Sequence, residues 1–321
     1  MKLRLSNGLE IEEGDTRILL DPQVTEPGVP AFVTHAHADH VPRDLRWPKG
    51  PIFCTEATAD VLEARYGLKA DLTSRVHFRE SIEVGDLVVT PFPAGHVLGS
   101  SMFLVEGRNT AILYTGDVNP IGGLTVESPA EVPKAEVLVI ESTYGSAKFR
   151  FPHPQGVRAR LALWVAEVLR EGKIPAILAY AVGKAQEVTV ALNRLLDVPV
   201  YADREVLKVT RAYRKYVRAP LDSEPIGDGS EGVLVISSRR SAQAHKISIA
   251  TGWALLGKPP WAEAGFPLSS HADFVGLLEV VHRSGASLAF TVRGRTLELA
   301  RHIRTDLDVE ARPLGRRWEE L

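Results

Sequence analysis

The first third of the chain alternates short apolar runs with tight turns, a pattern that predicts β-strands. Residues 3–6 and 9–12 flank Asn7-Gly8, a pair that is typical of two-residue hairpin turns. Apolar residues recur at helical spacing over 57–66, and an apolar run at 137–141 ends in an acid, which favours a buried strand. We expect the remaining strands of this part at 17–21, 87–91, 102–106 and 110–114.

After residue 150 the pattern changes to helices that alternate with strands. We expect helices at 156–171, 184–196, 204–218, 274–283 and 296–307, and strands at 174–180, 233–237, 287–292 and 309–313. Such alternation implies parallel strands joined by crossover helices, so the predicted fold class is α/β. Residues 220–232 are rich in Pro, Gly, Asp and Ser, which predicts an exposed loop.

The composition is that of a soluble globular protein, because 45% of the residues are hydrophobic and 24% are charged. No apolar run reaches the ~18 residues that a membrane span needs, and the N-terminus lacks a signal-peptide pattern. Cys54 is the only cysteine, so a metal site must rest on His and Asp. We therefore expect a cytoplasmic protein without membrane contact.

Charge is divided unevenly along the chain, although the net charge is only −2. Residues 1–141 carry 12 basic and 21 acidic side chains, whereas residues 142–321 carry 26 basic and 19 acidic ones. This asymmetry suggests an acidic, metal-holding part and a basic part that faces a polyanion. Ordinary variation between two lobes is the alternative.

The densest group of candidate metal ligands follows an apolar run at 31–33: His35, His37, Asp39 and His40. Imidazole nitrogen and carboxylate oxygen are the ligands that zinc and similar divalent metals prefer. Residues two apart on an extended segment point the same way, so the first three are expected to converge on one site. His40 breaks the alternation and reaches a second position. The alternative is a histidine-rich surface loop.

Three more residues complete a candidate metal centre. His96 lies in a segment whose flanking glycines allow a tight turn, and Asp117 follows a predicted strand. A carboxylate at that place can bridge two metals through its two oxygens. His271 lies in the segment Ser269-Ser-His-Ala-Asp273. Each of these residues alone is more often structural, but together with the first group they favour a metal site.

These segments resemble those of a known superfamily. His35-Ala-His-Ala-Asp-His40, followed by Gly95-His96 and Gly116-Asp117, resembles the metallo-β-lactamase superfamily, which implies an αββα sandwich with metals at one edge. Three further motifs, at 141–145, 179–187 and 269–273, resemble those of the β-CASP nucleases. The chain also resembles a short bacterial and archaeal branch described as messenger-RNA 3′-end processing factors or ligase-associated exonucleases.

The resemblance implies a domain division. The metallo-β-lactamase domain would comprise residues 1–149 and 256–321. A small inserted α/β domain with a parallel sheet, the β-CASP cap, would comprise residues 150–255.

The resemblance also implies a role for each candidate. His35, His37 and His96 would hold a first metal, and Asp39, His40 and the bridging Asp117 a second. The expected cofactor is zinc, as one or two ions, with manganese as an alternative. Asp39, Glu141 and His271 are the expected catalytic residues.

His271 is the candidate acid for the leaving group, oriented by Glu141, since a ribose or deoxyribose oxygen leaves poorly without a proton. The alternative is that His271 only orients a metal ligand. Asp273 would serve in a similar supporting position, or simply cap the helix that follows it.

One position departs from the pattern of the RNA-cleaving members, which carry a histidine where this chain has Arg293. A guanidinium keeps its proton and cannot ligate a metal. The second metal site is therefore expected to be weak, easily vacated, or filled only with substrate. Arg293 would then contact the scissile phosphate, or, as the alternative, point outward in a protein without activity.

Two basic features suit a polyanion. On the helix expected at 204–218, one stripe is formed by Arg204, Lys208, Arg211, Lys215 and Arg218. Phosphates can track such a stripe, although a solvated helix face is at least as good a reading. Gly183-Lys184 falls at a strand-to-helix junction, where backbone N–H groups can take a phosphate.

The leading hypothesis is a metal-dependent nuclease that cleaves single-stranded RNA. A nuclease that degrades single-stranded DNA from one end in DNA repair is the first alternative. A hydrolase of small thioesters or lactams, and a catalytically impaired nucleic-acid-binding homologue, are the others. The sequence is compatible with a homodimer.

Overall fold

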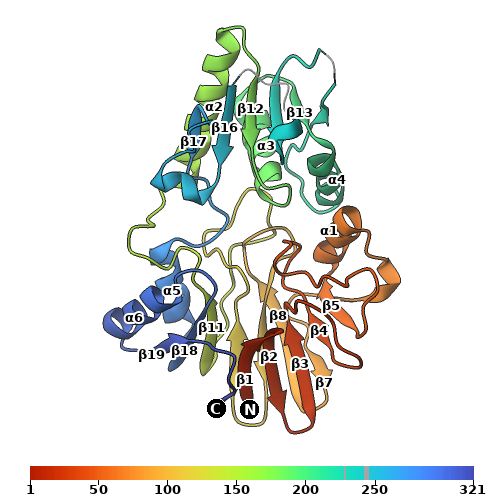
Figure 1. The fold of residues 1–321 in the computed structure, drawn as a ribbon, viewed down its shortest axis with the longest axis vertical. Helices are drawn as coiled ribbons and strands as arrows, with labels where there is room; N and C mark the ends of the chain where they lie inside the picture. The colour runs from red at the N-terminus through yellow and green to blue at the C-terminus, as the bar shows by residue number, and fades with distance from the viewer. Residues whose placement is uncertain (228, 242–245) are drawn as a thin grey trace. The chain divides into compact units, whose positions relative to one another are not determined.

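A computed structural model describes residues 1–227, 229–241 and 246–321 and divides the chain into two compact units (Figure 1). Unit 1 comprises Met1–Gly122, Glu127–Phe149 and His271–Leu321. Unit 2 comprises Gly123–Val126 and Arg150–Ser270. The candidate metal ligands therefore all lie in unit 1, and the basic helix lies in unit 2.

The first sheet of unit 1 has the strand order β20-β1-β2-β3-β4-β5-β6. The predicted hairpin at Asn7-Gly8 is confirmed, because Ser6 pairs with Gly8 across an antiparallel turn and Gly8 has a positive φ of 76°. The strands are β1 (Lys2–Ser6), β2 (Gly8–Glu13), β3 (Thr16–Leu20), β4 (Ala31–Phe32), β5 (Ile52–Thr55), β6 (Thr73–Val76) and β20 (Glu319–Glu320).

The second sheet of unit 1 has the order β19-β18-β11-β10-β9-β8-β7. Its strands run antiparallel from β7 to β10 and parallel from β10 to β19, so the C-terminal ends of these four parallel strands lie at one edge. The strands are β7 (Ile82–Val84), β8 (Leu87–Pro93), β9 (Ser101–Glu106), β10 (Ala111–Tyr114), β11 (Val137–Glu141), β18 (Leu288–Val292) and β19 (Glu310–Pro313).

The two sheets of unit 1 pack face to face around a shared apolar core. Phe32 from the first sheet stacks on Phe53 at 4.9 Å and meets Phe103 of the second sheet edge-on at 5.3 Å between ring centroids. Helices α5 (Phe274–Ser284) and α6 (Thr296–Leu307) cover the outer face of the second sheet, and α1 (Glu56–Tyr66) packs beside β5 and β6 (Figure 1). A short 3₁₀ turn, η1 (Ala70–Leu72), follows α1. The predicted αββα sandwich is thus confirmed.

Unit 2 is built on a parallel sheet with the order β14-β13-β15-β12-β16-β17. Its strands are β12 (Pro175–Leu178), β13 (Val200–Ala202), β14 (Glu224–Pro225), β15 (Val233–Ile236), β16 (Lys246–Ala250) and β17 (Ala264–Phe266). Its helices are α2 (Pro154–Arg170), α3 (Lys184–Leu195) and α4 (Arg204–Tyr213), with 3₁₀ turns η2 (Arg239–Ser241) and η3 (Gly252–Leu256). Apolar residues of the three α-helices share one core with the sheet, as the alternating pattern predicts.

The structure differs from the expected boundaries at three places. Unit 2 continues to Ser270 rather than to 255, because β17 pairs with β16 and extends the parallel sheet. Helix α4 ends at Tyr213 rather than at 218, since the chain then tightens into turns ahead of Pro220. The loop expected at 220–232 contains the short strand β14, and its residue 228 lies outside the described residues.

In the described ranges, none of the helices is both long enough and apolar enough to cross a lipid bilayer.

The sandwich core generates a stability prediction. Replacing the fully buried Phe32 by Ala should lower the free energy of unfolding of unit 1 by about 3–5 kcal/mol, because it leaves a cavity between the two sheets. Leu297→Ala is the matched control, since Leu297 is 76% exposed, and should change the free energy by less than about 0.5 kcal/mol. Urea unfolding followed by circular dichroism measures both; equal effects would contradict this packing.

Candidate metal centre

The segment that carries the first histidines is a turn and not a strand. β4 ends at Phe32, and the His40 N–H donates to the carbonyl of His37 at 3.0 Å. His35 and His40 are buried, whereas the Asp39 side chain is 70% exposed. His35 and His37 therefore converge as expected, but a turn brings them together and not the alternation of a strand. Asp39 does not converge with them.

His96 is presented by a tight loop between β8 and β9. The Ser100 hydroxyl accepts the N–H groups of His96 and Val97 at 3.1 Å each, and the Ala94 N–H donates to the Ser100 carbonyl. Gly95 has a φ of +68°, and a Cβ there would lie 2.3 Å from the Asn119 carbonyl oxygen. The loop therefore needs this glycine to hold the imidazole in place.

Asp117 and Glu141 come from neighbouring parallel strands at the same sheet edge. Asp117 follows β10, and Glu141 is the last residue of β11. Gly116 between strand and ligand has a φ of +50°, and a Cβ there would lie 2.8 Å from the Thr34 side chain. This close approach brings the Asp117 carboxylate next to the loop that carries His35.

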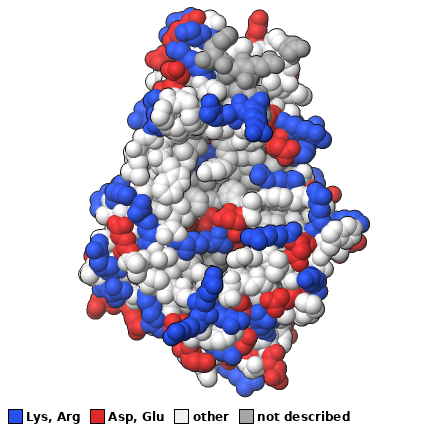
Figure 2. All heavy atoms as spheres, viewed as in Figure 1, with Lys and Arg blue, Asp and Glu red and all other residues white. Residues whose placement is uncertain are grey.

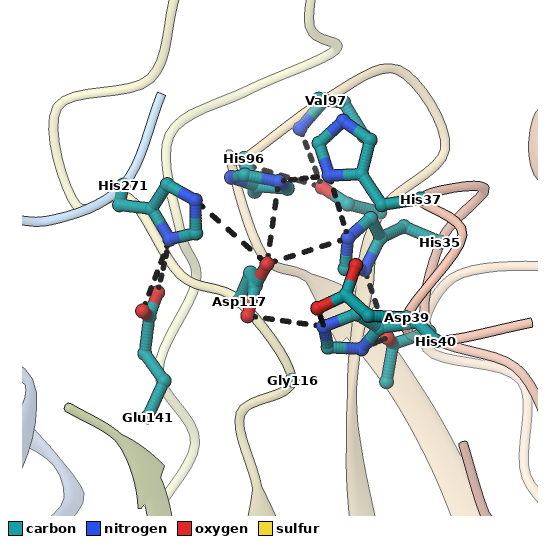
Figure 3. A network of polar contacts seen from close by, with 12 residues as sticks. His35, His37, Asp39, His40, His96, Val97, Gly116, Asp117, Glu141 and His271 are labelled. Atoms are coloured by element: carbon teal, nitrogen blue, oxygen red, sulfur yellow. Dashed lines mark hydrogen bonds and ion pairs between the residues drawn. The ribbon is translucent and has the colours of Figure 1, made fainter. Parts of the chain in front are cut away.

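Four side chains offer ligand atoms that all lie within 4.8 Å of one another: His35, His37, His96 and Asp117. His37 Nδ1 lies 3.0 Å from the Nε2 atoms of both His35 and His96 (Figure 3). Asp117 Oδ2 lies 3.5 Å from His35 Nε2 and 3.6 Å from His96 Nε2.

This spacing fits a metal ion. Two ligands that each lie about 2.1 Å from a tetrahedral ion are about 3.4 Å apart. A single ring nitrogen such as His37 Nδ1 also cannot make good hydrogen bonds to two other ring nitrogens at once, since it carries either one proton or one lone pair. Three imidazoles and one carboxylate match a divalent metal such as zinc in ligand type and number.

The electrostatics favour the protonation states that bind a metal. Burial lowers the pKa of His35, and the neighbouring His40 lowers it further. Burial, together with His271, holds the pKa of His96 well below its ordinary value. Burial alone would raise the pKa of Asp117, but His40 and His271 outweigh it and hold that pKa well below the usual range. Neutral imidazoles beside an ionised carboxylate are the forms that ligate.

His271 forms a second arrangement with Glu141 on the other side of Asp117. His271 Nδ1 lies 3.0 Å from each Glu141 oxygen, and its Nε2 lies 3.8 Å from Asp117 Oδ2 (Figure 3). Glu141 also accepts the Val118 N–H at 2.8 Å, which fixes the carboxylate. Asp273 caps α5 by accepting the Gly276 N–H at 2.8 Å, as the capping alternative predicts.

Asp21 is a site residue that the sequence reasoning missed. This buried carboxylate lies 2.6 Å from His40 Nδ1, accepts the Thr34 N–H and hydroxyl at 2.8 Å each, and accepts the Tyr114 hydroxyl at 3.0 Å. Burial lowers the pKa of His40, but Asp117 and Asp21 outweigh burial and raise it to about 10. The signal was available, since Asp21 ends an apolar strand in the same way as Asp117 and Glu141 do.

Asp39, His40 and Asp117 do not form a compact ligand set among the described residues. His40 Nε2 lies 3.2 Å from Asp117 Oδ1 and 3.5 Å from Asp39 Oδ2, and the same Asp39 oxygen is paired with Arg293. Arg293 Nη1 donates to Asp39 Oδ2 at 2.9 Å, and only 28% of the Arg293 side chain is exposed. The alternative in which Arg293 points outward is therefore wrong.

Two candidate substrate contacts in unit 2 have a different geometry from that expected. The Gly183 N–H donates to Gln186 Oε1, and the Lys184 and Ala185 N–H groups donate to carbonyls, so these amides cannot take a phosphate as predicted. The Lys184 side chain is buried, with Nζ 3.5 Å from Glu187 Oε2.

Helix α4 retains part of the predicted basic stripe. Arg204, Lys208 and Arg211 line a groove together with Leu207 and Ile226. Lys215 and Arg218 lie beyond the helix end and do not line this groove.

Comparisons with known proteins agree with this architecture. The model of the family "Beta-lactamase superfamily domain" matches residues 16–175. A probable DNA ligase of Opitutus terrae is 31% identical over 302 residues, which cover 89% of this chain and 28% of that protein.

Two archaeal relatives are named as ribonucleases. An RNase J-like protein of Methanocaldococcus jannaschii is 29% identical over 243 residues, covering 65% of this chain and 58% of that protein. RNase aCSPSF2 of Saccharolobus solfataricus is 28% identical over 298 residues, covering 79% of this chain and 60% of that protein. The chain thus spans less than two thirds of the length of these relatives. Matches of this kind to a chain with this sandwich show that it belongs to the metallo-β-lactamase superfamily, in its β-CASP group.

Proposed function

We propose that this protein is a metal-dependent nuclease that hydrolyses phosphodiester bonds of single-stranded RNA. The observation that carries the proposal is the convergence of His35, His37, His96 and Asp117 beside the His271–Glu141 pair. The names of relatives from two archaea, both called RNases, support RNA as the substrate. Unit 1 would be the metallo-β-lactamase domain and unit 2 the β-CASP cap.

The four converging side chains would hold the ion, with zinc the expected metal and manganese the alternative. A divalent metal held there would lower the pKa of a coordinated water and offset charge on the phosphoryl oxygens. Asp117 Oδ1 faces His40, whose other nitrogen is tied to Asp21, so the carboxylate is held from both sides. This support keeps Asp117 Oδ2 directed at the histidines.

His271 and Glu141 would supply the proton for the leaving oxygen. Glu141 accepts from His271 Nδ1, which keeps a proton on that nitrogen and leaves Nε2 facing the candidate metal ligands. A buried carboxylate in this position also stabilises the imidazolium form of the ring. His271 Nε2–H would then donate its proton to the sugar oxygen as the P–O bond breaks.

The charge of unit 2 supports a polyanionic substrate. Unit 2 carries 17 basic and 11 acidic side chains, whereas unit 1 carries 21 basic and 29 acidic ones. In Figure 2, basic side chains gather where Figure 1 labels α4, with a few acidic ones beside them. The α4 groove combines cations with apolar side chains, a combination that suits a phosphate chain carrying bases.

A nuclease for single-stranded DNA is the second candidate. The probable DNA ligase from Opitutus terrae aligns with 89% of this chain, which favours a role beside DNA ends.

The first prediction of this proposal concerns the metal and the substrate. Zinc- or manganese-loaded protein should degrade end-labelled single-stranded RNA faster than DNA of the same sequence, and Asp117→Asn should lose both the bound ion and cleavage. His77→Ala is the control, since His77 is exposed and remote in sequence from the ligands, and should keep both. Atomic emission and gel assays measure the two quantities. Faster DNA cleavage would favour the second candidate, and retention of the ion by the Asp117→Asn variant would refute the ligand assignment.

The second prediction separates proton donation from metal binding. His271→Ala should slow RNA cleavage about 10²–10⁴-fold while the bound ion is retained, because only the proton donor is lost. A p-nitrophenyl phosphodiester, whose leaving group needs no proton, should be cleaved by the variant nearly as fast as by the wild type. An equal loss on both substrates, or loss of the ion, would assign His271 to the metal instead.

The third prediction concerns the α4 groove. The double variant Lys208→Ala/Arg211→Ala should weaken binding of single-stranded RNA and reduce the slope of log K against log salt by about 1.4, since each phosphate contact contributes about 0.7. Lys173→Ala/Lys246→Ala removes the same charge from unit 2 outside the groove and serves as control. Equal slopes for the two double variants would mean that α4 makes no specific contact with the strand.

A further inference from the structure

A fixed cation, Arg293, is paired with Asp39 and interacts with the charge of the candidate metal ligand Asp117. Arg293 follows β18, where its backbone takes a left-handed φ of +57°, which is uncommon for a residue other than glycine. Gly294 also has a positive φ, and a Cβ there would lie 2.4 Å from the Ser142 carbonyl oxygen. The Arg295 N–H donates to that same carbonyl at 2.8 Å. This turn is therefore locked against the end of β11, and it aims the Arg293 side chain.

The guanidinium of Arg293 binds one carboxylate and interacts with the charge of two others. Nη1 donates to Asp39 Oδ2 at 2.9 Å and Nη2 donates to the Asp39 carbonyl at 3.3 Å. The side chain is mostly buried, and its charge also interacts with Asp21 and Asp117, both of which are buried carboxylates. A guanidinium is always charged, so it offsets these negative charges without any bound ion.

The exposed carboxylate on this side of Asp117 is already paired with a cation. His40 uses Nδ1 on Asp21 at 2.6 Å, whereas its buried Nε2 has no hydrogen-bond partner among the described residues and lies 3.2 Å from Asp117 Oδ1 and 3.5 Å from Asp39 Oδ2. The Asp39 carboxylate is paired with Arg293. Among the described residues, two groups have ligand atoms that all lie within 4.8 Å of one another, and neither contains Asp39 or His40: the first is His35, His37, His96 and Asp117, and the second is Asp117, Glu141 and His271. An ion placed here would have to displace a permanent cation from its partner.

We propose that Arg293 is a resident cation that takes the place of a second metal ion, so that the chain binds one ion, at His35, His37, His96 and Asp117. Asp39 then acts as a positioning residue for Arg293 and not as a metal ligand. This inference rests on the metal binding of the proposed function, but not on the identity of the substrate. The left-handed backbone at Arg293 costs conformational free energy, and the interaction of its guanidinium with the buried carboxylates offsets that cost.

The test counts ions per chain in protein dialysed against zinc or manganese. The wild type should hold one ion, and Arg293→Lys should also hold one, because the ammonium keeps the positive charge. Arg293→His should hold two, since a neutral imidazole removes the competing charge and adds a ligand beside Asp39 and His40. In the manganese forms, electron paramagnetic resonance should show an isolated ion for the first two proteins and a coupled pair for Arg293→His.

Arg295→His is the matched control two residues away. Its guanidinium lies over the Phe149 ring, 5.6 Å from the centroid, so this variant should hold one ion. Two ions in the wild type, or one ion in Arg293→His with circular dichroism equal to that of the wild type, would overturn the inference. A wild type that binds no ion would instead overturn the proposed function, so the two failures are distinguishable.

Discussion

The buried carboxylate of Asp117 is the group on which the arrangement of this site depends. An ionised carboxylate taken out of water costs several kcal/mol unless charges and hydrogen bonds offset it. Asp117 is only 5% exposed, and the imidazoles that contact its carboxylate come from three other segments of the chain. His35 and His40 come from the turn after β4, His96 from the β8–β9 loop and His271 from the segment before α5. These segments are therefore coupled through the two carboxylate oxygens of Asp117. A displacement of any one segment changes the contacts that the others make with this carboxylate.

The fold supplies this coupling by ending strands at one edge. Asp21, Asp117 and Glu141 each stand at or just beyond the end of an apolar strand, where the sheet holds the backbone rigidly and the side chain is free to leave the core. Between these ends the chain approaches itself so closely that only small residues fit, as at Gly116 against Thr34. The positions of the ligands are thus set by backbone contacts as much as by the ligands' own chemistry.

What could be predicted from the sequence was what depends on local pattern and residue type. The hairpin at Asn7-Gly8 and the parallel sheet of unit 2 follow from turn chemistry and from alternating periodicity, and both are confirmed. The direction of Asp39 could not be predicted, because the two-residue period applies to extended backbone and the chain turns at His37–His40. The position of Asp21 at a strand end was visible in the sequence, but its contact with His40, 19 residues away, was not. The hydrogen bond from the Gly183 N–H to Gln186 depends on a side-chain rotamer that spacing does not reveal.

A phosphate chain would meet opposite fields on the two units, and this decides which contacts must be short-range. Unit 1 carries a net charge of −8 and unit 2 a net charge of +6. Attraction over a Debye length of about 8 Å can come from unit 2, where cations such as Arg204 and Arg211 are exposed. Unit 1 repels a polyanion at that range, so a phosphate can be stabilised there only by cations that touch it. Arg293 is a cation already set among the carboxylates of that unit, and an ion held by His35, His37 and His96 would be the other. The proposed chemistry of the site and the negative charge of its unit are compatible for this reason, since the carboxylates that would repel a phosphate chain are the same groups that would hold cations next to it.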